Sequence, residues 1–241
     1  HQPFLNHDAR NIPDADLLLG KPLPVKSAEE FYARHRGSFD PSRQLQWLID
    51  TPQRLQQYLE LANRLGTSML VNVEIDVGLH RGGVDSDEAL IAILDLIHAH
   101  PEQLTFSGFM GYDAHVGAGV PGILGSPEEL LDKAMASYQH YVDLARQRYP
   151  AMWQGSFTLN TGGSPSYRLH ERESLSTEVS VGTALLKPSH YDLATLEGHR
   201  PAAFIATPVL KAEGPIRLPA LDDKSAIFSW WDVNQRQTYF V

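Results

Sequence analysis

Short apolar runs alternate with amphipathic segments over the first 190 residues, and this alternation restricts the possible folds more than any other feature. The clearest strand signal is MLVNVEIDV at residues 69–77. Further runs typical of strands lie at 16–20, 45–50, 104–110, 157–160 and 183–186. Helical patterns lie between the runs, at 28–35, 51–65, 86–98 and 126–148. Strands and helices that alternate at this spacing are typical of parallel β/α units.

Several of the predicted helices are bounded by residues that favour helix ends. Ser27 is placed to cap the helix at 28–35. Thr51 is placed to cap the next helix, Pro52 takes its first position, and Gly66 ends it. The sequence SPEE at 126–129 opens the longest helix. These boundaries support the assignment of the segments between the strands as helices.

The predicted fold is α/β, with a (β/α)8 barrel of the TIM type over residues 1–198. A closed barrel has eight strands, whereas about six are predicted before residue 190. We therefore expect the barrel to be incomplete in this chain, most naturally at its N-terminal side. His1 in place of methionine, and a strand pattern that stops at Val241, favour a fragment or a processed chain over ends left by tag removal.

Over residues 199–241 the pattern changes, because alternating apolar residues continue without helices between them. Strands are predicted at 202–210 and 226–241, with a hairpin turn at 234–237. The pair Trp230-Trp231 is expected in the core of this region. The region is predicted to be the beginning of a separate antiparallel β domain.

The composition narrows the classes of partner. A formal net charge of −9 without a basic stripe argues against nucleic acid. No apolar run is long enough for a membrane helix, and the start of the chain does not resemble a signal peptide. With no cysteine, the chain holds no disulfide and no zinc–thiolate site. We expect a cytoplasmic protein with a small-molecule ligand, and a local cationic pocket for a phosphate is compatible with the overall charge.

The strand at 69–77 runs into a polar loop rich in glycine, and barrel active sites lie at the carboxyl ends of strands. Alternation places Glu74 and Asp76 on one face, toward the barrel interior. Buried carboxylates need partners, and Arg81 is close in sequence. His80 and Arg81, beyond the strand end, are candidate site residues. For the two acids the alternative is an ion network that only stabilises the barrel.

The strand at 104–110 is followed by a second polar segment, GYDAHVG. Gly111 permits close approach of the backbone. Tyr112 and His115 are able to stack on a planar ligand or hydrogen-bond to it, and they are the predicted catalytic residues. The alternative is a tight turn with a tyrosine in the core.

A third segment, TGGSPS at 161–166, follows the strand at 157–160. Glycines and hydroxyls after a barrel strand can form a nest of N–H donors for a phosphate. Thr161, Gly162 and Gly163, together with Ser164, are therefore predicted to bind an anion. Many Gly-Ser turns bind nothing, so this signal depends on its position in the barrel.

The last polar segment, TEVSVGT at 177–183, precedes His190-Tyr191-Asp192. Tyr191 is able to reach a phosphate or a substrate, whereas Glu178 is compatible with a purely structural role. The remaining histidines lack metal-ligand spacing and are expected at the surface: His7, His35, His98, His100, His140, His170 and His199. The sequence contains no metalloprotease, hydrolase-elbow, Walker or dinucleotide motif.

Taken together, VEIDVGLHRGGV, GFMGYDAHVG, TGGSPSY and TEVSVGTALL resemble the D-threonine aldolase / D-serine dehydratase-like family, which has an alanine-racemase-type barrel. Their order and spacing are also similar to that family, over roughly residues 70 to 190. The N-terminal 25 residues resemble the region after the first barrel strand in a bacterial branch of the family.

This resemblance implies an enzyme that holds pyridoxal phosphate as a Schiff base to a lysine on the first barrel strand. It implies that Arg81 contacts the cofactor on the ring side, with His80 nearby, and that Tyr112 lies over or beside the cofactor. It assigns the phosphate to Thr161, Gly162, Gly163 and Ser164. It places Tyr191 at the border of the phosphate or the substrate.

Two features of the family are not found in this sequence. The lysine motif of the first strand is missing, and Lys21, after DLLLG, does not match it. The C-terminal His-x-Cys or His-x-Asp pair, which binds a divalent metal such as Zn or Mn in many members, is also missing. Both are expected in parts of the protein outside this chain.

The resemblance implies aldol cleavage, dehydration or racemisation of a D-amino or β-hydroxy amino acid through a carbanion at Cα. It also implies a homodimer. Without the lysine, the alternative is a non-catalytic barrel that binds pyridoxal phosphate or another phosphorylated ligand. An unrelated phosphate-binding barrel is the third hypothesis.

Overall fold

The computed structural model describes residues 2–117, 125–172, 175–204, 206–217 and 225–241. The chain divides into two compact units, His1–Val181 and Gly182–Val241, which we describe separately. The sequence-based division after residue 198 separates a cofactor-binding barrel from a β domain. The boundary at residue 198 was drawn between functional domains, not between compact units, and it stays a prediction.

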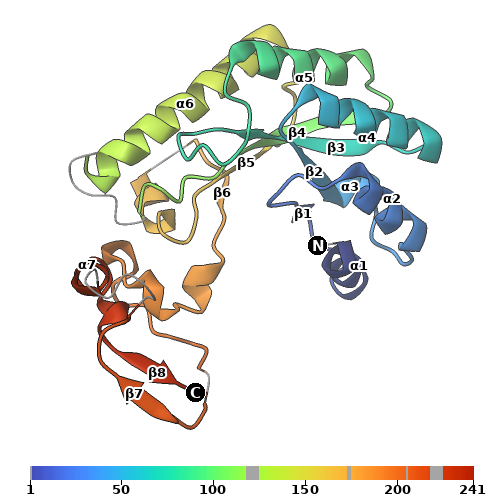
Figure 1. Ribbon diagram of the computed structural model, residues 1–241. Helices are drawn as coiled ribbons and strands as arrows, with labels where there is room; N and C mark the ends of the chain where they lie inside the picture. Colours follow the sequence, from blue (N-terminus) through green and yellow to red (C-terminus); the bar gives the residue numbers. More distant parts are fainter. Residues whose placement is uncertain (1, 118–124, 173–174, 205, 218–224) are drawn as a thin grey trace. The chain divides into compact units, whose positions relative to one another are not determined.

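The first unit is built on a curled sheet of six parallel strands in the order in which they occur along the chain (Figure 1). The strands are β1 (Leu17–Leu18), β2 (Leu45–Ile49), β3 (Met69–Ile75), β4 (Leu104–Gly111), β5 (Thr158–Thr161) and β6 (Glu178–Val179). Every neighbouring pair is parallel. The sheet is half of a TIM-type barrel, which confirms the predicted fold class.

Three helices of this unit, α4, α5 and α6, follow one another along the outer side of the sheet (Figure 1). The helices are α1 (Gln2–Asn11), α2 (Val25–Arg34), α3 (Pro41–Gln44), α4 (Pro52–Leu65), α5 (Asp87–Ala99) and α6 (Pro127–Arg148). The predicted cap of α4 by Thr51 is confirmed, and side chains cap α5 and α6 as well. The Thr51 and Ser86 side chains accept from the first turns of α4 and α5, and Ser126 forms a capping box with Glu129.

The predicted start of α2 was wrong. The helix begins at Val25 after Pro24, and Ser27 is not its cap. The Ser27 N–H donates to the Pro24 carbonyl at 2.8 Å, so Ser27 already belongs to the first turn. A proline fixes φ near the helical value, and this allows the helix to start without a side-chain cap.

The two faces of the curled sheet differ in chemistry. Trp47, Val73 and Phe109 are fully buried and belong to the apolar core. Positions on the opposite face carry buried polar groups: Gln46, Asn72, Glu74 and Asn160. Successive residues of a strand point to opposite faces, so the inner face is the polar one.

A hydrogen bond across the inner face shows how strongly the sheet curls. Gln46 Nε2 donates to Thr158 Oγ1 at 2.8 Å, although β2 and β5 are separated by two strands in the sheet. Asn72 Nδ2 donates to Gln46 Oε1 at 3.1 Å and joins the same network. Polar side chains of β2, β3 and β5 therefore meet across the inner face of the sheet at this height along the strands.

The second unit consists mainly of short turns and a small sheet. Its elements are η3 (Thr183–Leu185), η4 (Ser189–Tyr191), η5 (Ala194–Leu196), β7 (Lys211–Glu213), α7 (Ser225–Trp231), η7 (Val233–Arg236) and β8 (Thr238–Phe240). β7 and β8 are antiparallel. The predicted antiparallel sheet is therefore confirmed.

Several predictions of local structure near the C-terminus were wrong. Residues 183–186 form a 3₁₀ turn instead of a strand, because the Leu185 and Leu186 N–H groups bond to carbonyls three residues back. The described part of 202–210 contains no strand, and Pro208 has no N–H for a sheet ladder. The sixth strand of the large sheet comes earlier, as β6.

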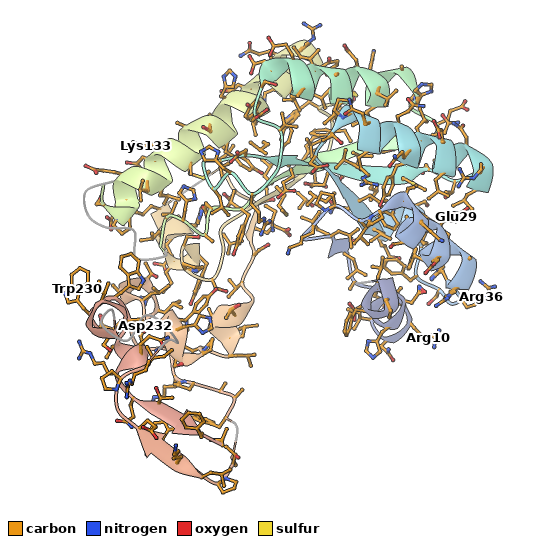
Figure 2. The ribbon with its side chains drawn as sticks, viewed as in Figure 1. Arg10, Glu29, Arg36, Lys133, Trp230 and Asp232 are labelled. Carbon is orange, nitrogen blue, oxygen red and sulfur yellow. The ribbon has the colours of Figure 1, made fainter. Side chains whose placement is uncertain are left out.

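The segment predicted as the last strand is a helix, a 3₁₀ turn and only then β8. The predicted hairpin turn at 234–237 therefore falls largely within η7. Trp230 and Trp231 lie on α7 and are 78% and 76% exposed, so they are not in a core (Figure 2). Only residues 238–240 of the predicted strand have a pairing partner, which is β7.

Candidate functional site

The segments after β3, β4 and β5 lie at one edge of the sheet. All three strands are parallel neighbours, so their carboxyl ends point the same way. In parallel α/β proteins this edge is where ligands bind. The polar segments singled out in the sequence are therefore brought to one edge, as predicted.

Glu74 and Arg81 form the ion pair that the sequence suggested. Arg81 Nη2 lies 3.2 Å from Glu74 Oε1, and the Glu74 side chain is only 6% exposed. Burial raises the pKa of the Glu74 carboxyl, and the Arg81 guanidinium opposes that rise. The loop between them folds back on the strand, because the Val84 N–H donates to the Glu74 carbonyl at 2.8 Å. Arg81 is thereby held at the mouth of the half-barrel with part of its guanidinium open to solvent.

Asp76 organises the next part of the same loop. Its Oδ1 accepts from the N–H groups of Gly78 at 2.9 Å and His80 at 3.0 Å. Its Oδ2 lies 2.8 Å from His80 Nδ1. Burial would raise the pKa of Asp76, but the hydrogen bonds from Gly78 and His80 outweigh it and lower the pKa. The His80 side chain is 83% exposed, so it contacts Asp76 at the surface of the site.

Tyr112 lies between Arg81 and the glycine-rich turn. The Arg81 Cζ is 4.2 Å from the centroid of the Tyr112 ring, within cation–π distance. A Cβ on Gly163 would lie 2.7 Å from Tyr112 Cε2, so only glycine fits against this ring. Arg81 and the turn after β5 therefore converge on one aromatic side chain, although they are about 80 residues apart in sequence.

His115 is partly buried beside the end of β3. A Cβ on Gly78 would lie 3.4 Å from His115 Nε2. Among the described residues, Nδ1 of His115 is buried and has no hydrogen-bond partner. Burial lowers the pKa of this imidazole, against the opposing charges of Asp113 and Asp76. The lowered pKa favours the neutral form of the ring, and its buried Nδ1 is unsatisfied within the described residues.

The turn after β5 is buried, and part of its hydrogen-bonding capacity is used within the protein. The Gly163 N–H donates to Ser166 Oγ at 3.0 Å. Thr161 Oγ1 lies 2.7 Å from Ser176 Oγ and 3.3 Å from His170 Nδ1. Gly162 has a positive φ of 77°. The Gly163 N–H and the Thr161 hydroxyl, both predicted to hold an anion, are therefore engaged by neighbouring side chains.

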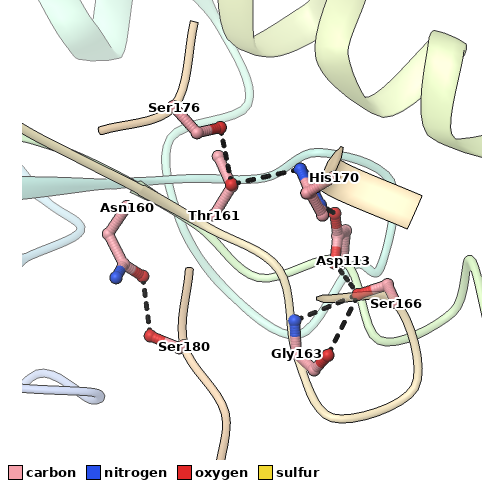
Figure 3. Close-up of polar contacts among 8 residues, drawn as sticks. All are labelled: Asp113, Asn160, Thr161, Gly163, Ser166, His170, Ser176 and Ser180. Carbon is pink, nitrogen blue, oxygen red and sulfur yellow. Dashed lines mark hydrogen bonds and ion pairs between the residues drawn. The ribbon is translucent and has the colours of Figure 1, made fainter. Parts of the chain in front are cut away.

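Three residues that the sequence reasoning did not select are hydrogen-bonded to one another at this turn: Asp113, Ser166 and His170 (Figure 3). Asp113 Oδ1 accepts from Ser166 Oγ at 2.5 Å, and its Oδ2 accepts from His170 Nε2 at 2.6 Å. The surface location predicted for His170 was wrong, since its side chain is 2% exposed. Its position in the 3₁₀ turn Tyr167–Arg172 directs the imidazole inward. The available signal was that Asp113 and Ser166 stand inside two of the selected motifs.

The other predicted residues are distributed as follows. His7, His98 and His140 are exposed, as expected, whereas the side chains of three others are partly buried: His35, His100 and His199. Lys21 is exposed after β1. Tyr191 lies in η4 of the second unit, and its predicted role at the phosphate stays a prediction.

No cluster of three or more metal-ligating side chains occurs in the described part of the chain. Within the same residues, none of the helices combines the length and the apolar character that crossing a membrane requires.

The curled parallel sheet is half of a (β/α) barrel of the TIM type, and polar side chains lie at the carboxyl ends of its strands. The model of the alanine racemase N-terminal domain family matches residues 29–190. The chain belongs to this family. No curated protein matches the chain.

Solved structures are similar in fold at low identity. D-Threonine aldolase from Filomicrobium marinum is 17% identical with a TM-score of 0.58, over 73% of this chain and 45% of that one. D-threo-3-hydroxyaspartate dehydratase from Delftia sp. HT23 is 21% identical with a TM-score of 0.53, over 69% and 41%. An alanine racemase-like protein from Idiomarina loihiensis is 24% identical with a TM-score of 0.53, over 70% and 42%. The chain thus aligns with less than half of each of these structures.

Proposed function

We propose that this chain forms part of the cofactor site of a pyridoxal-phosphate enzyme that cleaves, dehydrates or racemises a D-amino or β-hydroxy amino acid. The observation that carries the proposal is the convergence of Arg81 and the turn at Gly163 on the Tyr112 ring. A cation and a glycine turn on one aromatic ring suit a ligand that has both a planar ring and a phosphate. The family and its aldolase, dehydratase and racemase neighbours agree with this chemistry.

The described residues fit such a ligand in three respects. Arg81 supplies a positive charge at the mouth, and its side chain is 36% exposed, so a ligand is able to reach it. The turn places backbone N–H groups in a buried setting, that of Gly162 among them, and Ser164 is buried in the same turn. His115 has a buried nitrogen that lacks a partner within the described residues. When bound, pyridoxal phosphate supplies an electron sink for a negative charge at the substrate Cα.

In this proposal each residue has a defined task. Glu74 holds the Arg81 guanidinium in place, and when the cofactor is bound this permanent cation would disfavour protonation of the ring nitrogen. Tyr112 fixes the distance between Arg81 and the phosphate turn. His115, whose pKa is lowered by burial, is suited to accept and return a proton near neutral pH. His80 borders the site from the surface.

The finer parts of the proposal concern the whole protein. The proposal requires a lysine that holds the cofactor, and the family resemblance adds a divalent metal, Zn or Mn. Tyr191 would border the phosphate or the substrate. A homodimer is expected from the family resemblance, and a cytoplasmic location is the default expectation.

The test uses the whole protein and has two readouts. A visible absorbance band that hydroxylamine abolishes is expected for a lysine-linked cofactor. Borohydride reduction followed by mass spectrometry should then find the adduct on a lysine. Cofactor uptake without an adduct would favour the second candidate, a non-catalytic binding barrel, for which the missing lysine motif is the supporting observation. A protein that never takes up the cofactor would refute both.

A further inference from the structure

Of Glu74, Asp76 and Asp113, the carboxylate of Asp113 is the least exposed. It follows β4, and its side chain is 2% exposed. One carboxylate oxygen accepts from Ser166 Oγ and the other from His170 Nε2, at 2.5 and 2.6 Å. A buried carboxylate that keeps two short hydrogen bonds fixes both of its donors in place.

These two donors reach the turn after β5 at both of its ends (Figure 3). Ser166 Oγ accepts from the Gly163 N–H at 3.0 Å. The His170 ring lies 3.3 Å from Thr161 Oγ1, and its Cδ2 is 3.5 Å from where a Cβ on Gly162 would be. Asp113 on one strand end therefore determines the backbone path of the turn on the next strand end.

The carboxylate of Asp113 is enclosed by the protein. Its side chain is 2% exposed, and each of its oxygens accepts a hydrogen bond from a protein group. A buried carboxylate needs such partners. The arrangement thus holds the turn without placing an exposed carboxylate beside it.

The order Thr161, His170, Asp113 is also that of a nucleophile, a base and an orienting acid. A nucleophile must be open to its substrate, whereas Thr161 is 1% exposed and its hydroxyl is shared with Ser176. His170 is buried as well. The geometry is therefore that of a support rather than of a second reactive centre.

We propose that Asp113 is a positioning residue that, through Ser166 and His170, holds the turn 161–166 in the conformation that binds the phosphate of the ligand. The inference rests on the proposed function, because it assumes that this turn receives a phosphate. Asp113 itself does not touch the ligand.

The experiment compares two ligands, pyridoxal 5′-phosphate and pyridoxal, which lacks the phosphate. Binding of each to the whole protein is measured by titration calorimetry. In Asp113→Ala the affinity for the phosphorylated ligand should fall by at least about tenfold, as expected when a buried hydrogen-bonded group is removed. The affinity for pyridoxal should change by less than about twofold, which is within the error of such comparisons. A general loss of stability would weaken both ligands equally.

Tyr138→Phe is the matched control. Tyr138 Oη donates to the Phe109 carbonyl at 2.9 Å, so this variant also removes a buried hydrogen bond at β4, but on the helix side. It should keep the preference for the phosphorylated ligand. Asp113→Asn, which retains an acceptor for Ser166, should restore most of the preference that Asp113→Ala loses.

Ser166→Ala serves as the test variant if Asp113→Ala does not fold, because it leaves the hydrogen bond between His170 and Asp113 in place. It should also lose the phosphate preference, and the Gly163 amide should exchange its hydrogen faster in the ligand-free protein. An unchanged preference in the Asp113 and Ser166 variants overturns the inference while the proposed function stands. If the parent protein binds neither ligand, the proposed function fails first, and the inference falls with it.

Discussion

The inner and outer faces of the curled sheet are made by the same strands, yet the outer face is apolar and the inner face carries buried polar groups. On the outer face, Val73 and Phe109 pack among helices in an apolar core. On the inner face, Asn72 and Glu74 are equally buried but polar. Apolar burial stabilises a fold in proportion to the area removed from water, whereas buried polar groups contribute little net stability. The comparison teaches that alternate residues of one strand have different roles: those on the outer face stabilise the fold, and those on the inner face supply polar groups.

The inner face keeps its polar groups at some cost. Gln46 and Thr158 satisfy each other across the interior. Asn72 Oδ1 is buried without a hydrogen-bond partner in the described structure. Each such group disfavours folding by an amount that an apolar side chain would not. We expect substitutions on the two faces to separate stability from pH dependence and ligand binding.

The largest effect is expected on the outer face. Phe109→Ala should lower the free energy of unfolding by about 3–5 kcal/mol, the usual range for removing a buried phenylalanine. The ring is fully buried and packs against the rings of Phe106, Tyr138 and Trp153. Urea denaturation followed by tryptophan fluorescence measures the change. Thr105→Ala, at an exposed position of β4, is the control. A loss below about 1 kcal/mol would contradict the assignment of this face as the stabilising one.

A smaller effect is expected at Asp76, where the inner face opens to solvent. Asp76→Asn should lower stability by about 1–3 kcal/mol at neutral pH, because hydrogen bonds to a charged group are lost. The pKa of Asp76 is lowered in the folded protein. Its contribution is therefore present above the ordinary pKa of aspartate and disappears as the pH falls through the lowered value. Denaturation at a series of pH values should show the variant approaching the parent in acid. A difference that persists unchanged in acid would refute the charge-based explanation.

The outer face was largely predictable from sequence, because its signals are local. The Thr51 cap, Pro52 and the end at Gly66 predicted α4, and the pattern at 69–77 predicted β3. The convergence of the site segments followed from one topological rule, that parallel strands end at the same edge. Arg81 was paired with Glu74 because a buried carboxylate needs a partner and Arg81 is close in sequence.

What sequence could not supply depends on contacts between distant residues. The buried His170 is hydrogen-bonded through its Nε2 to the carboxylate of Asp113, which lies 57 residues earlier in the chain. Two engaged donors in the turn after β5, the Gly163 N–H and the Thr161 hydroxyl, were invisible for the same reason. In the second unit, residues such as Trp230 are exposed, so apolar periodicity there reported nothing about burial. This explains why its helix was taken for a strand.

Glu74 sharpens the comparison, because its pH dependence should have the opposite sign to that of Asp76. Burial raises the pKa of Glu74, so the folded protein binds a proton at higher pH than the unfolded chain does. The stability of the parent relative to Glu74→Gln should therefore increase as the pH falls from neutral through the raised pKa. At neutral pH the two should differ by only about 1 kcal/mol, because glutamine keeps a hydrogen bond to Arg81. Parallel pH profiles for the Glu74 and Asp76 variants would contradict the inferred difference between them.

The smallest effect is expected at His80, which lies at the outer limit of the inner face. Its side chain is 83% exposed, and exposed ion pairs contribute little, so His80→Asn should change stability by less than about 0.5 kcal/mol. Asparagine is the suitable replacement because residue 80 has a φ of 55°, which asparagine tolerates better than most residues. The backbone N–H groups of Gly78 and residue 80 would still donate to Asp76. The acid dependence seen for Asp76 should consequently survive in this variant. If this acid dependence disappears in His80→Asn, the imidazole rather than the loop backbone lowers the pKa of Asp76. The polar contacts that matter would then include an exposed side chain as well as the buried residues.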